Sequence, residues 1–574
     1  MLIVGLNTSG YVSSAAIVVD GKVAFAAAQE RFDRRKYSKY FPMQAMRAGL
    51  EHIGARMDDV DCFAIGYNPA ISVAGRPRAG FSEWPGYPGY RFASNPNHLL
   101  PQLSPAEWRE TQQIFLAANG DETRLRYVTH HIAHAANAFL LSGETHAAVL
   151  TCDGYGERAA LTMGRADTGG IEIAKQVDFP HSIGMFYATM TQFLGFSPHG
   201  DEWKLMGAAA YGDPSRHRDT LGRTLAWTAE GDLEVDLSYF NYFDFDVSPM
   251  HRPKLEQLIG PARRPDEPLD QRHFDLAAAV QKLTEDYLRT VLAALHRTTG
   301  ATVACLAGGV MMNSVFNGKA AMDGPFERVF VPFAPDDNGN SIGAALWVAW
   351  QEGEVEPGRQ AATPPYLGPS YTDAEIRATL ERFGLEFEHC PDVAERTAQL
   401  IAAGYVVGWF QGRMEFGDRA LGSRSILADP RDPGMKERLN RAVKYREAFR
   451  PFAPSILAAR QSAYVAADRA IASPYMDKAL PIRQTLRAQV PAVVHADGSA
   501  RIQTVESAHH PLFHSMIEAF ERHTGVPLVL NTSFNVAGEP VVESPCDAIR
   551  TFFASGLDAL AIGSFILCKP SCKP

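Results

Sequence analysis

The sequence predicts an α/β protein whose first domain is duplicated, because similar strand–loop units occur at three places. The segments MLIVGLN, AAVLTC and TVACLA read as apolar strands, and each ends in a loop of polar or glycine residues. After the first loop, two further strands are joined by Asp20-Gly21, a pair typical of tight hairpins. After the second, the loop DGYGE leads into one more strand. In the third unit, Gly308-Gly309 leads from the strand into a predicted helix.

The glycine-rich loops at these strand ends suit a nucleotide. Glycine lets the backbone approach a phosphate, and the N–H groups at the start of a following helix favour an anion. The repeated units therefore predict a duplicated α/β domain with a nucleotide between its halves. The alternative is that the loops are three unrelated turns of a large α/β protein.

The length of the chain and one proline-rich stretch predict two domains. A chain of 574 residues exceeds what one hydrophobic core normally supports. Residues 351–371 contain four prolines and three glycines and have no periodicity. We expect a first domain over residues 1–355, a linker over 356–371 and a second domain over 372–574.

Charge and cysteine content exclude several classes of protein. A net charge of −10 and an isoelectric point near 6.0 disfavour a nucleic-acid or anionic-membrane surface. Seven scattered cysteines without CxxC spacing are typical of reduced cytosolic proteins. No run of about 18 apolar residues occurs, and the start MLIVGLN reads as a strand rather than a signal peptide. We therefore expect a cytoplasmic protein that binds neither nucleic acid nor membrane.

Three histidines open the apolar stretch HHIAHAANAF, which reads as a helix capped by Thr129. His130 and His134 are four residues apart, and His131 and His134 are three apart, so spacing allows either pair on one face. Two imidazoles can supply half of a metal's ligands, which carboxylates usually complete. The acidic candidates are Asp153, Asp336 or Asp337, and Asp201 or Glu202. The alternative is a histidine pair that is solvated or hydrogen-bonded locally.

The segment 413–450 is locally basic in an acidic chain, with ten Arg or Lys against six Asp or Glu. Planar guanidinium groups suit bidentate binding of phosphate or carboxylate. Five side chains are candidates for an anion pocket: Arg419, Arg424, Lys444, Arg446 and Arg450. Arg501 on a predicted strand and Asn531 at the end of another are further polar candidates. The alternative is a mixed-charge helix with surface salt bridges, and for Asn531 a plain turn.

Eleven stretches along nearly the whole chain resemble, in the same order, the O-carbamoyltransferase family of the nodulation and tobramycin type. They are DGKVAFAAAQERFDRRKYSKYFP, THHIAHAANAF, TCDGYGE, FPHSIGMFYATMTQFLGF, GDEWKLMGAAAYG, LAGGVMMNSVFNGK, GNSIGAALW, GRMEFGDRALGSRSILADPRDP, REAFRPFAPSIL, DGSARIQTV and LVLNTSFNVAGEPVV. The resemblance implies an actin-like ATPase (TsaD-like) duplicated N-terminal domain and a YrdC-like α/β C-terminal domain.

The resemblance also implies a reaction. The C-terminal domain would convert carbamoyl phosphate and ATP into carbamoyl adenylate and pyrophosphate. The N-terminal domain would pass the carbamoyl group to a hydroxyl of a small-molecule acceptor, such as a sugar or natural product, and release AMP. The implied metal is iron(II), with Mg²⁺ as an alternative that accompanies ATP. A homodimer is expected from base rates.

The resemblance carries roles onto matching residues. His130, His134, Asp153 and Asp337 match the metal ligands. The nucleotide-binding set is Gly154, Gly184, Lys204, Gly308, Gly309 and Asn313. The set that grips carbamoyl phosphate and ATP is Arg419, Lys444, Arg450, Arg501 and Asn531. The catalytic candidates are His131, Tyr11 and Lys36, with His131 as a spare base for the acceptor hydroxyl.

One departure from the family concerns the first loop, where a His-Asp pair is common and this chain has Tyr11 and Val12. This departure prompts the hypothesis of a nucleotide-binding scaffold with a degenerate site. A separate alternative is a kinase or ATPase that uses the actin-like fold, against which the basic C-terminal segment argues.

Overall fold

The computed structural model describes residues 1–8, 10–68, 124–244, 247–358, 363–444, 446–447 and 449–570. Its contacts divide the chain into two compact units. The first unit comprises residues 1–29, 37–316 and 323–363, and the second comprises 30–36, 317–322 and 364–574. No feature of the sequence predicts that the short segments 30–36 and 317–322 pack with the second unit.

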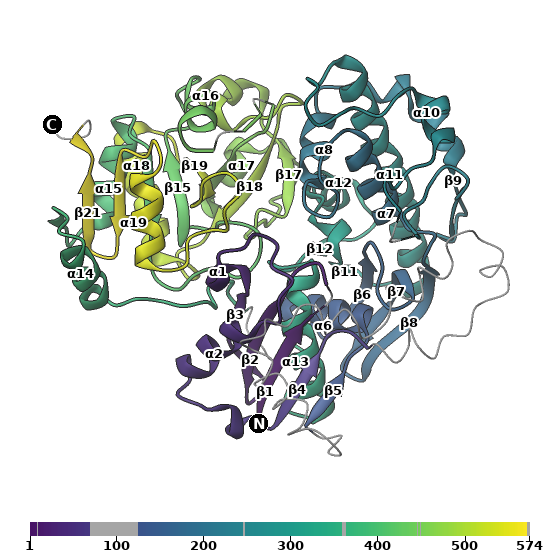
Figure 1. Cartoon of the computed structure of the whole chain (residues 1–574), viewed down its shortest axis with the longest axis horizontal. Helices are drawn as coiled ribbons and strands as arrows, with labels where there is room; N and C mark the ends of the chain where they lie inside the picture. The colour runs from purple at the N-terminus through teal and green to yellow at the C-terminus, as the bar shows by residue number, and fades with distance from the viewer. Residues whose placement is uncertain are drawn as a thin grey trace. The chain divides into compact units, whose positions relative to one another are not determined.

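The first unit contains two sheets of the same topology. Among the described residues, the first sheet has the order β3-β2-β1-β4-β5 and the second the order β12-β11-β6-β7-β8 (Figure 1). In each, three antiparallel strands in chain order are followed by two that run parallel to the first. The repeated topology confirms the duplicated α/β domain.

The strands of the first sheet are β1 (Leu2–Asn7), β2 (Ser14–Val19), β3 (Lys22–Ala28), β4 (Cys62–Ile65) and β5 (Leu125–Tyr127). Those of the second are β6 (His146–Cys152), β7 (Ala159–Asp167), β8 (Gly170–Asp178), β11 (Val303–Ala307) and β12 (Arg328–Phe330). The predicted hairpin joins β2 and β3, where Asp20 and Gly21 both have positive φ, at 48° and 72°. That geometry matches the twist of the two strands.

Two buried helices, α6 (His130–Ser142) and α13 (Asn340–Gln351), pack together and against these sheets. The packing is close because glycines stand at the contacts. A Cβ on Gly5 of β1 would lie 1.8 Å from the Ser341 carbonyl oxygen, and one on Gly343 would lie 1.9 Å from that of Ala133. The starts of both helices are thereby held beside the strand ends that carry the polar loops.

Among the remaining elements of the first unit, α2 packs on β2 and β3 of the first sheet, and α11 contacts β6 and β7 of the second. The longest helix is α11 (Gln271–Thr299), which begins with a capping box at Asp270 and ends at Gly300 with φ 63°. The others are α2 (Met43–His52), α7 (Ile183–Phe193), α8 (Glu202–Ala209), α9 (Arg218–Leu221), α10 (Pro253–Ile259) and the hairpin β9 (Leu225–Trp227) and β10 (Leu233–Val235). Helix α12 (Ser314–Asp323) begins in the first unit, and its residues 317–322 pack with the second.

The second unit is built on a mixed sheet with the order β13-β21-β20-β14-β15-β19-β16-β18-β17 among the described residues (Figure 1). Its strands are β13 (Glu388–His389), β14 (Val407–Phe410), β15 (Arg424–Ala428), β16 (Ala453–Leu457), β17 (Lys478–Pro481), β18 (Ser499–Val505), β19 (Leu528–Ser533), β20 (Ala559–Ile562) and β21 (Phe565–Cys568). Its helices include α14 (Asp373–Arg382), α15 (Val393–Ala402), α16 (Met435–Leu439), α17 (Gln461–Tyr464), α18 (Pro511–Thr524) and α19 (Pro545–Phe553). This unit is a second α/β domain, as predicted.

Segment 30–36 is anchored in the second unit through helix α1 (Glu30–Asp33) and the arginines around it. Arg34 donates hydrogen bonds to the carbonyl oxygens of Val541, at 2.6 Å, and Pro540, at 2.9 Å. Arg31 donates to the carbonyl oxygen of Gly417 at 3.3 Å. Because φ of Arg34 is 59°, these contacts also hold a conformation unusual for a non-glycine residue.

Two local expectations need correction. Thr129 precedes α6, but its side chain makes no capping hydrogen bond. The His130 N–H donates instead to Glu157, whose carboxylate oxygens lie 2.9 and 3.2 Å away. In the basic segment 413–450, the expected mixed-charge helix is the short helix α16 followed by a π-helical turn, Asn440–Lys444. Within the described residues, no helix is both long and apolar enough to span a membrane.

Candidate functional site

Four side chains from three distant segments meet at the carboxyl end of β6. His130 and His134 lie on the first turns of α6, Asp153 follows β6 directly, and Asp337 begins the turn before α13. One ligand atom from each residue lies within 4.8 Å of the others. The structure therefore selects His130 with His134 and Asp337 over Asp336, choices that spacing alone left open.

The spacing of these atoms fits a single metal ion. The Nε2 atoms of His130 and His134 are 3.1 Å apart, and Asp153 Oδ2 lies 3.3 and 2.9 Å from them. Asp337 Oδ1 lies 3.4 and 3.5 Å from the same two nitrogens. Ligands held about 2.1 Å from one ion are themselves roughly 3 to 3.5 Å apart in tetrahedral or octahedral geometry. Two nitrogen and two oxygen donors with this spacing suit a divalent first-row transition metal.

The electrostatics of the cluster also favour a cation. Burial opposes the charged form of His130, but Asp337 and Asp153 outweigh it and raise the pKa of His130 well above its ordinary value. Burial likewise opposes ionisation of Asp153, yet His130 and His134 hold its pKa well below the usual range. Burial and Asp153 oppose ionisation of Asp337, and the histidines still lower its pKa. The two carboxylates thus keep their charge and draw positive charge into the site.

Asn340 lies beside both histidines, and sequence reasoning did not single it out. Its Nδ2 lies 3.2 Å from His130 Nδ1 and 3.3 Å from His134 Nε2, while its Oδ1 is buried without a partner. Turning the amide over places Oδ1 beside His130 Nδ1, which can then donate a proton to it. That tautomer leaves the His130 Nε2 lone pair for a metal.

His131 is not placed to act as the spare base. Its Nδ1 lies 2.6 Å from Thr151 Oγ1, and its Nε2 lies 2.8 Å from the carbonyl oxygen of Ala159. Burial, with His130 and His134, lowers its pKa to about 3. Both ring nitrogens are therefore engaged in holding α6 against β6 and β7.

The other acidic candidates lie outside the four-residue cluster. Asp336 Oδ2 accepts a hydrogen bond from the Asn338 amide at 2.9 Å. Asp201 forms an ion pair with Lys204 at 3.0 Å. Glu202 accepts the backbone N–H of His199 at 2.7 Å.

Tyr11 lies beside the four-residue cluster, within a small aromatic group. Its hydroxyl donates to the Tyr155 hydroxyl at 2.8 Å, and Tyr155 is two residues beyond Asp153. Its ring packs on His199 at 4.8 Å between centroids, and Lys39 Nζ lies 5.8 Å from its centroid. Burial, with Asp337 and Asp153, raises the pKa of Tyr11. Sequence reasoning did not single out Tyr155, His199 or Lys39.

The predicted glycines line the same strand ends. A Cβ on Gly184 would lie 2.5 Å from the Asp153 carbonyl oxygen, and one on Gly309 would lie 3.0 Å from Asp153 Oδ1. Gly308 has φ 96°, and a Cβ there would lie 2.1 Å from the Cys152 carbonyl oxygen. Gly154 donates its N–H to Asp153 Oδ1 at 2.7 Å. Four of the predicted nucleotide-binding residues thus surround Asp153.

Two other residues of that set are engaged elsewhere. The Asn313 amide is paired with Gln281, at 2.9 and 3.1 Å, and also accepts the Phe316 N–H at 3.0 Å. The Asn313 side chain thus makes three hydrogen bonds inside the protein, which hold it against α11 and the start of α12. Lys204 pairs with Asp201 and lies over the rings of Phe196 and Trp203.

The second unit contains a group of cations whose charges act on one another: Arg419, Lys444, Arg446, Arg450 and Arg501. We call it the cationic group. Burial, followed by Arg419 and Arg446, lowers the pKa of Arg501 well below its ordinary value. Burial, followed by Arg446, Arg450 and Lys36, does the same for Lys444. Burial and Arg450 lower the pKa of Arg446 to about 9. Mutual repulsion in a partly desolvated site indicates that an anion is needed to stabilise the group.

The side chains predicted to bind carbamoyl phosphate and ATP are held in different ways. Lys444 is buried and donates to backbone and side-chain oxygens of Ser533 and Asn535, at 2.5 to 3.2 Å. The buried Asn531 amide donates to the Ala420 carbonyl oxygen at 3.1 Å and to Ser455 Oγ at 2.9 Å, and its Oδ1 has no partner. Arg450 pairs with Glu447 at 3.3 Å.

Two more predicted cations have positions that the sequence did not reveal. Lys36 belongs to the second unit, where its charge acts on Asp418 and on Lys444. Arg424 is fully buried, lies 3.7 Å from the Phe410 ring centroid and donates to the Gln411 carbonyl oxygen at 2.9 Å. Arg424 is therefore a structural residue of the sheet and is not placed in an anion pocket.

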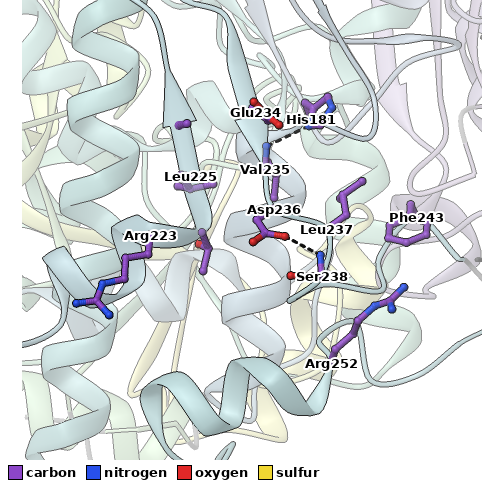
Figure 2. A pocket seen from close by; sticks show the side chains of 12 residues that line it. His181, Arg223, Leu225, Glu234, Val235, Asp236, Leu237, Ser238, Phe243 and Arg252 are labelled. Carbon is purple, nitrogen blue, oxygen red and sulfur yellow. Dashed lines mark hydrogen bonds between the residues drawn. The ribbon is translucent and has the colours of Figure 1, made fainter. Parts of the chain in front are cut away.

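A separate pocket of about 650 Å³ lies beside the hairpin β9–β10 in the first unit (Figure 2). His181 Nδ1 accepts the Val235 N–H at 3.0 Å in its wall. Figure 2 shows Arg223 and Arg252 on opposite sides of Asp236. The full lining is His181, Arg223, Thr224, Leu225, Ala226, Glu234, Val235, Asp236, Leu237, Ser238, Phe243 and Arg252. The pocket presents charges of both signs to a polar ligand.

The chain is similar to known proteins along most of its length. Residues 2–346 match the family described as Carbamoyltransferase N-terminus, and residues 398–569 match Carbamoyltransferase C-terminus. Nodulation protein NolNO of Sinorhizobium fredii (strain NBRC 101917 / NGR234) is 36% identical over 99% of this chain and 80% of its own length. Nodulation protein NolO of Bradyrhizobium diazoefficiens is 38% identical over 77% of this chain and 79% of its own. Nodulation protein U of the same Sinorhizobium strain is 34% identical over 93% of this chain and 94% of its own length.

The two family matches together span most of the chain, and the first covers more than half of it. They fall on the unit with the His/Asp cluster and on the unit with the cationic group. The chain belongs to the carbamoyltransferase family and is a carbamoyltransferase.

Proposed function

We propose that this carbamoyltransferase is ATP-dependent and acts on a hydroxyl group. In the first step, water cleaves the O–P bond of carbamoyl phosphate to give carbamate and inorganic phosphate. A carbamate oxygen then attacks the α-phosphorus of ATP, the bond to the β-phosphate oxygen breaks, and carbamoyl adenylate and pyrophosphate result. In the second step, a small-molecule acceptor hydroxyl attacks the carbamoyl carbon and AMP leaves. The nitrogen lone pair makes a carbamoyl group a poor electrophile, so a good leaving group is needed.

The cationic group of the second unit is the observation that carries the proposal. Lys444, Arg446 and Arg501 lie close enough to lower one another's or a shared neighbour's pKa. Two polyanions, carbamoyl phosphate and ATP, repel each other unless cations offset their charge. Preorganised cations in a water-poor site do so without reorganisation during the reaction. We assign to this group, together with Asn531, the binding of both substrates.

The first unit supplies the transfer site in this proposal. Helices α6 and α13 both begin at the His/Asp cluster, so their N-termini favour a phosphate there. The glycines around Asp153 allow the protein backbone to come close to the nucleotide. His130, His134, Asp153 and Asp337 would hold a metal, for which we propose iron(II). When bound, it would offset negative charge on the phosphate of the leaving AMP.

Product analysis tests this reaction against a kinase or ATPase. Incubation with ATP and carbamoyl phosphate should give AMP and pyrophosphate, since the α-phosphorus is attacked. A kinase or simple ATPase gives ADP instead. Formation of ADP as the main product, at a rate independent of carbamoyl phosphate, would contradict the proposal.

The acceptor is best sought by mass. Candidate sugars and natural products should gain the mass of one carbamoyl group only when ATP and carbamoyl phosphate are both present. A scaffold with a degenerate site would bind nucleotide and modify no acceptor in such a panel.

A further inference from the structure

His199 lies in a strained turn that its neighbours hold in place. Its φ of 62° is in the left-handed region, which costs a non-glycine residue free energy. The adjacent Gly200 carbonyl oxygen accepts the Tyr37 hydroxyl at 2.7 Å and the Trp203 indole N–H at 2.8 Å. The His199 N–H donates to Glu202 at 2.7 Å. Strain fixed in this way is concentrated at functional sites.

The imidazole of His199 has a packed face and unused nitrogens. Its ring packs on Tyr11 with 4.8 Å between centroids and 39° between planes. The residue is exposed, and in the part of the chain that the structure describes neither ring nitrogen has a hydrogen-bond partner. The ring is thus oriented by an aromatic neighbour while its proton-accepting atom stays available to a ligand.

Two observations place this ring next to the proposed transfer site. Tyr11, on which it packs, is hydrogen-bonded at 2.8 Å to Tyr155, two residues from Asp153. The charge of Asp153 also acts directly on His199. Desolvation of the imidazole by the surrounding protein, followed by the charge of Lys39, lowers the pKa of His199 to about 4, so the imidazole is neutral and keeps its lone pair at neutral pH.

We propose that His199 accepts the proton of the acceptor hydroxyl during carbamoyl transfer, an inference that rests on the proposed function. A ring nitrogen takes the proton as the hydroxyl oxygen forms a bond to the carbamoyl carbon. The bond from that carbon to the phosphate oxygen breaks, and AMP leaves with the electron pair. The imidazolium then returns its proton to solvent.

Other groups near the cluster are committed to other tasks. His131 uses both ring nitrogens within the protein. His130 and His134 direct their Nε2 atoms at the carboxylates. Tyr11 has a raised pKa and donates its proton to Tyr155, so it is not a base. Of the imidazoles near the cluster, that of His199 has a ring nitrogen available to the acceptor hydroxyl.

The test uses the full chain with His199→Asn, because asparagine tolerates the left-handed region and the backbone stays unstrained. Two rates are measured: carbamoyl-phosphate-dependent exchange of pyrophosphate into ATP, and carbamoylation of glycerol, the hydroxyl probe, together with AMP release. A base of low pKa is a weak one, so we expect carbamoylation to fall by about 100-fold, near the lower end of general-base effects. Exchange should stay within about twofold, because it precedes proton transfer.

Two companion variants make the result specific. His199→Gly should regain carbamoylation when imidazole is added, because a diffusing base can occupy the empty space. His146→Asn, an exposed histidine at the start of β6, should behave as wild type. Carbamoylation within about threefold of wild type in His199→Asn, or an equal loss of exchange and transfer, would overturn the assignment. A wild-type protein without exchange would contradict the proposed function itself, and with it this inference.

Discussion

The Nε2 atoms of His130 and His134 lie 3.1 Å apart, and Asp153 Oδ2 faces both of them. Two imidazole nitrogens at that distance repel unless a proton or a metal ion lies between them and the carboxylates. The raised pKa of His130 reflects the same demand for positive charge. A divalent ion meets it with two charges and satisfies all four ligand atoms.

His134→Ala should abolish tight metal binding, because it removes one of the four ligands at the centre of the cluster. Metal content by elemental analysis is the measurement, with Fe(II) as the added ion. At a free concentration 1,000 times its Kd, the ion should raise the free energy of unfolding of the wild type by about 4 kcal/mol. The increase for the variant should be far smaller. His146→Ala, on the surface, is the control. Equal metal content in both variants would show that the ligand assignment is wrong.

Asn340→Leu should lower the affinity for the metal by about 10- to 100-fold without removing a ligand, because in our proposal the amide fixes the His130 tautomer. Competition with a chelator of known affinity measures the change. Asn338→Leu is a suitable comparison, since the Asn338 amide bonds Asp336 instead of a histidine. If both variants bind metal as the wild type does, Asn340 has no part in orienting His130.

Gly308→Ala should destabilise the first unit by about 3 kcal/mol or more, because the new Cβ would lie 2.1 Å from the Cys152 carbonyl oxygen. Gly300→Ala separates collision from backbone strain: Gly300 also has positive φ, at 63°, but nothing lies within 4 Å of its Cβ position. It should cost only about 1 kcal/mol. The midpoint of thermal unfolding is measured for both variants. Equal shifts in the two midpoints would argue against the close contact between position 308 and the Cys152 carbonyl oxygen.

In the absence of ligands, the free energy of unfolding of Arg501→Met should equal or exceed that of the wild type. The reason is that burial, Arg419 and Arg446 already disfavour the charge on Arg501, as its lowered pKa shows. The same change should reduce pyrophosphate exchange by about 100-fold, since a hydrogen-bonded charge to a polyanion is lost. Arg483→Met, at an exposed position, should affect neither quantity. Loss of stability with normal exchange would make Arg501 structural.

Much of the architecture follows from local sequence. Apolar strands that end in Asp-Gly or Gly-Gly loops were enough to predict both repeated sheets, because strand period and turn chemistry are local properties. The choice between His130 and His131 as the partner of His134 was not local. It depends on β6 and β7, whose Thr151 and Ala159 engage His131.

Long-range placement accounts for what the sequence missed. Lys36 is near the N-terminus in sequence but packs with the second unit, and no pattern around it indicates that. His199 stands in a stretch noticed for its acidic residues, and its importance depends on stacking against Tyr11, 188 positions earlier in the chain. Arg424 was a candidate for an anion pocket and Asn313 matched a nucleotide-contacting turn, yet both side chains make hydrogen bonds inside the protein.

The most direct measurement is exchange of radiolabelled pyrophosphate into ATP, with and without carbamoyl phosphate. The proposed adenylation is reversible and needs only the cationic group, so exchange should occur in the wild type only when carbamoyl phosphate is present. It should persist in His134→Ala, which affects the transfer site alone. Folded wild-type protein that shows no exchange dependent on carbamoyl phosphate would contradict the account.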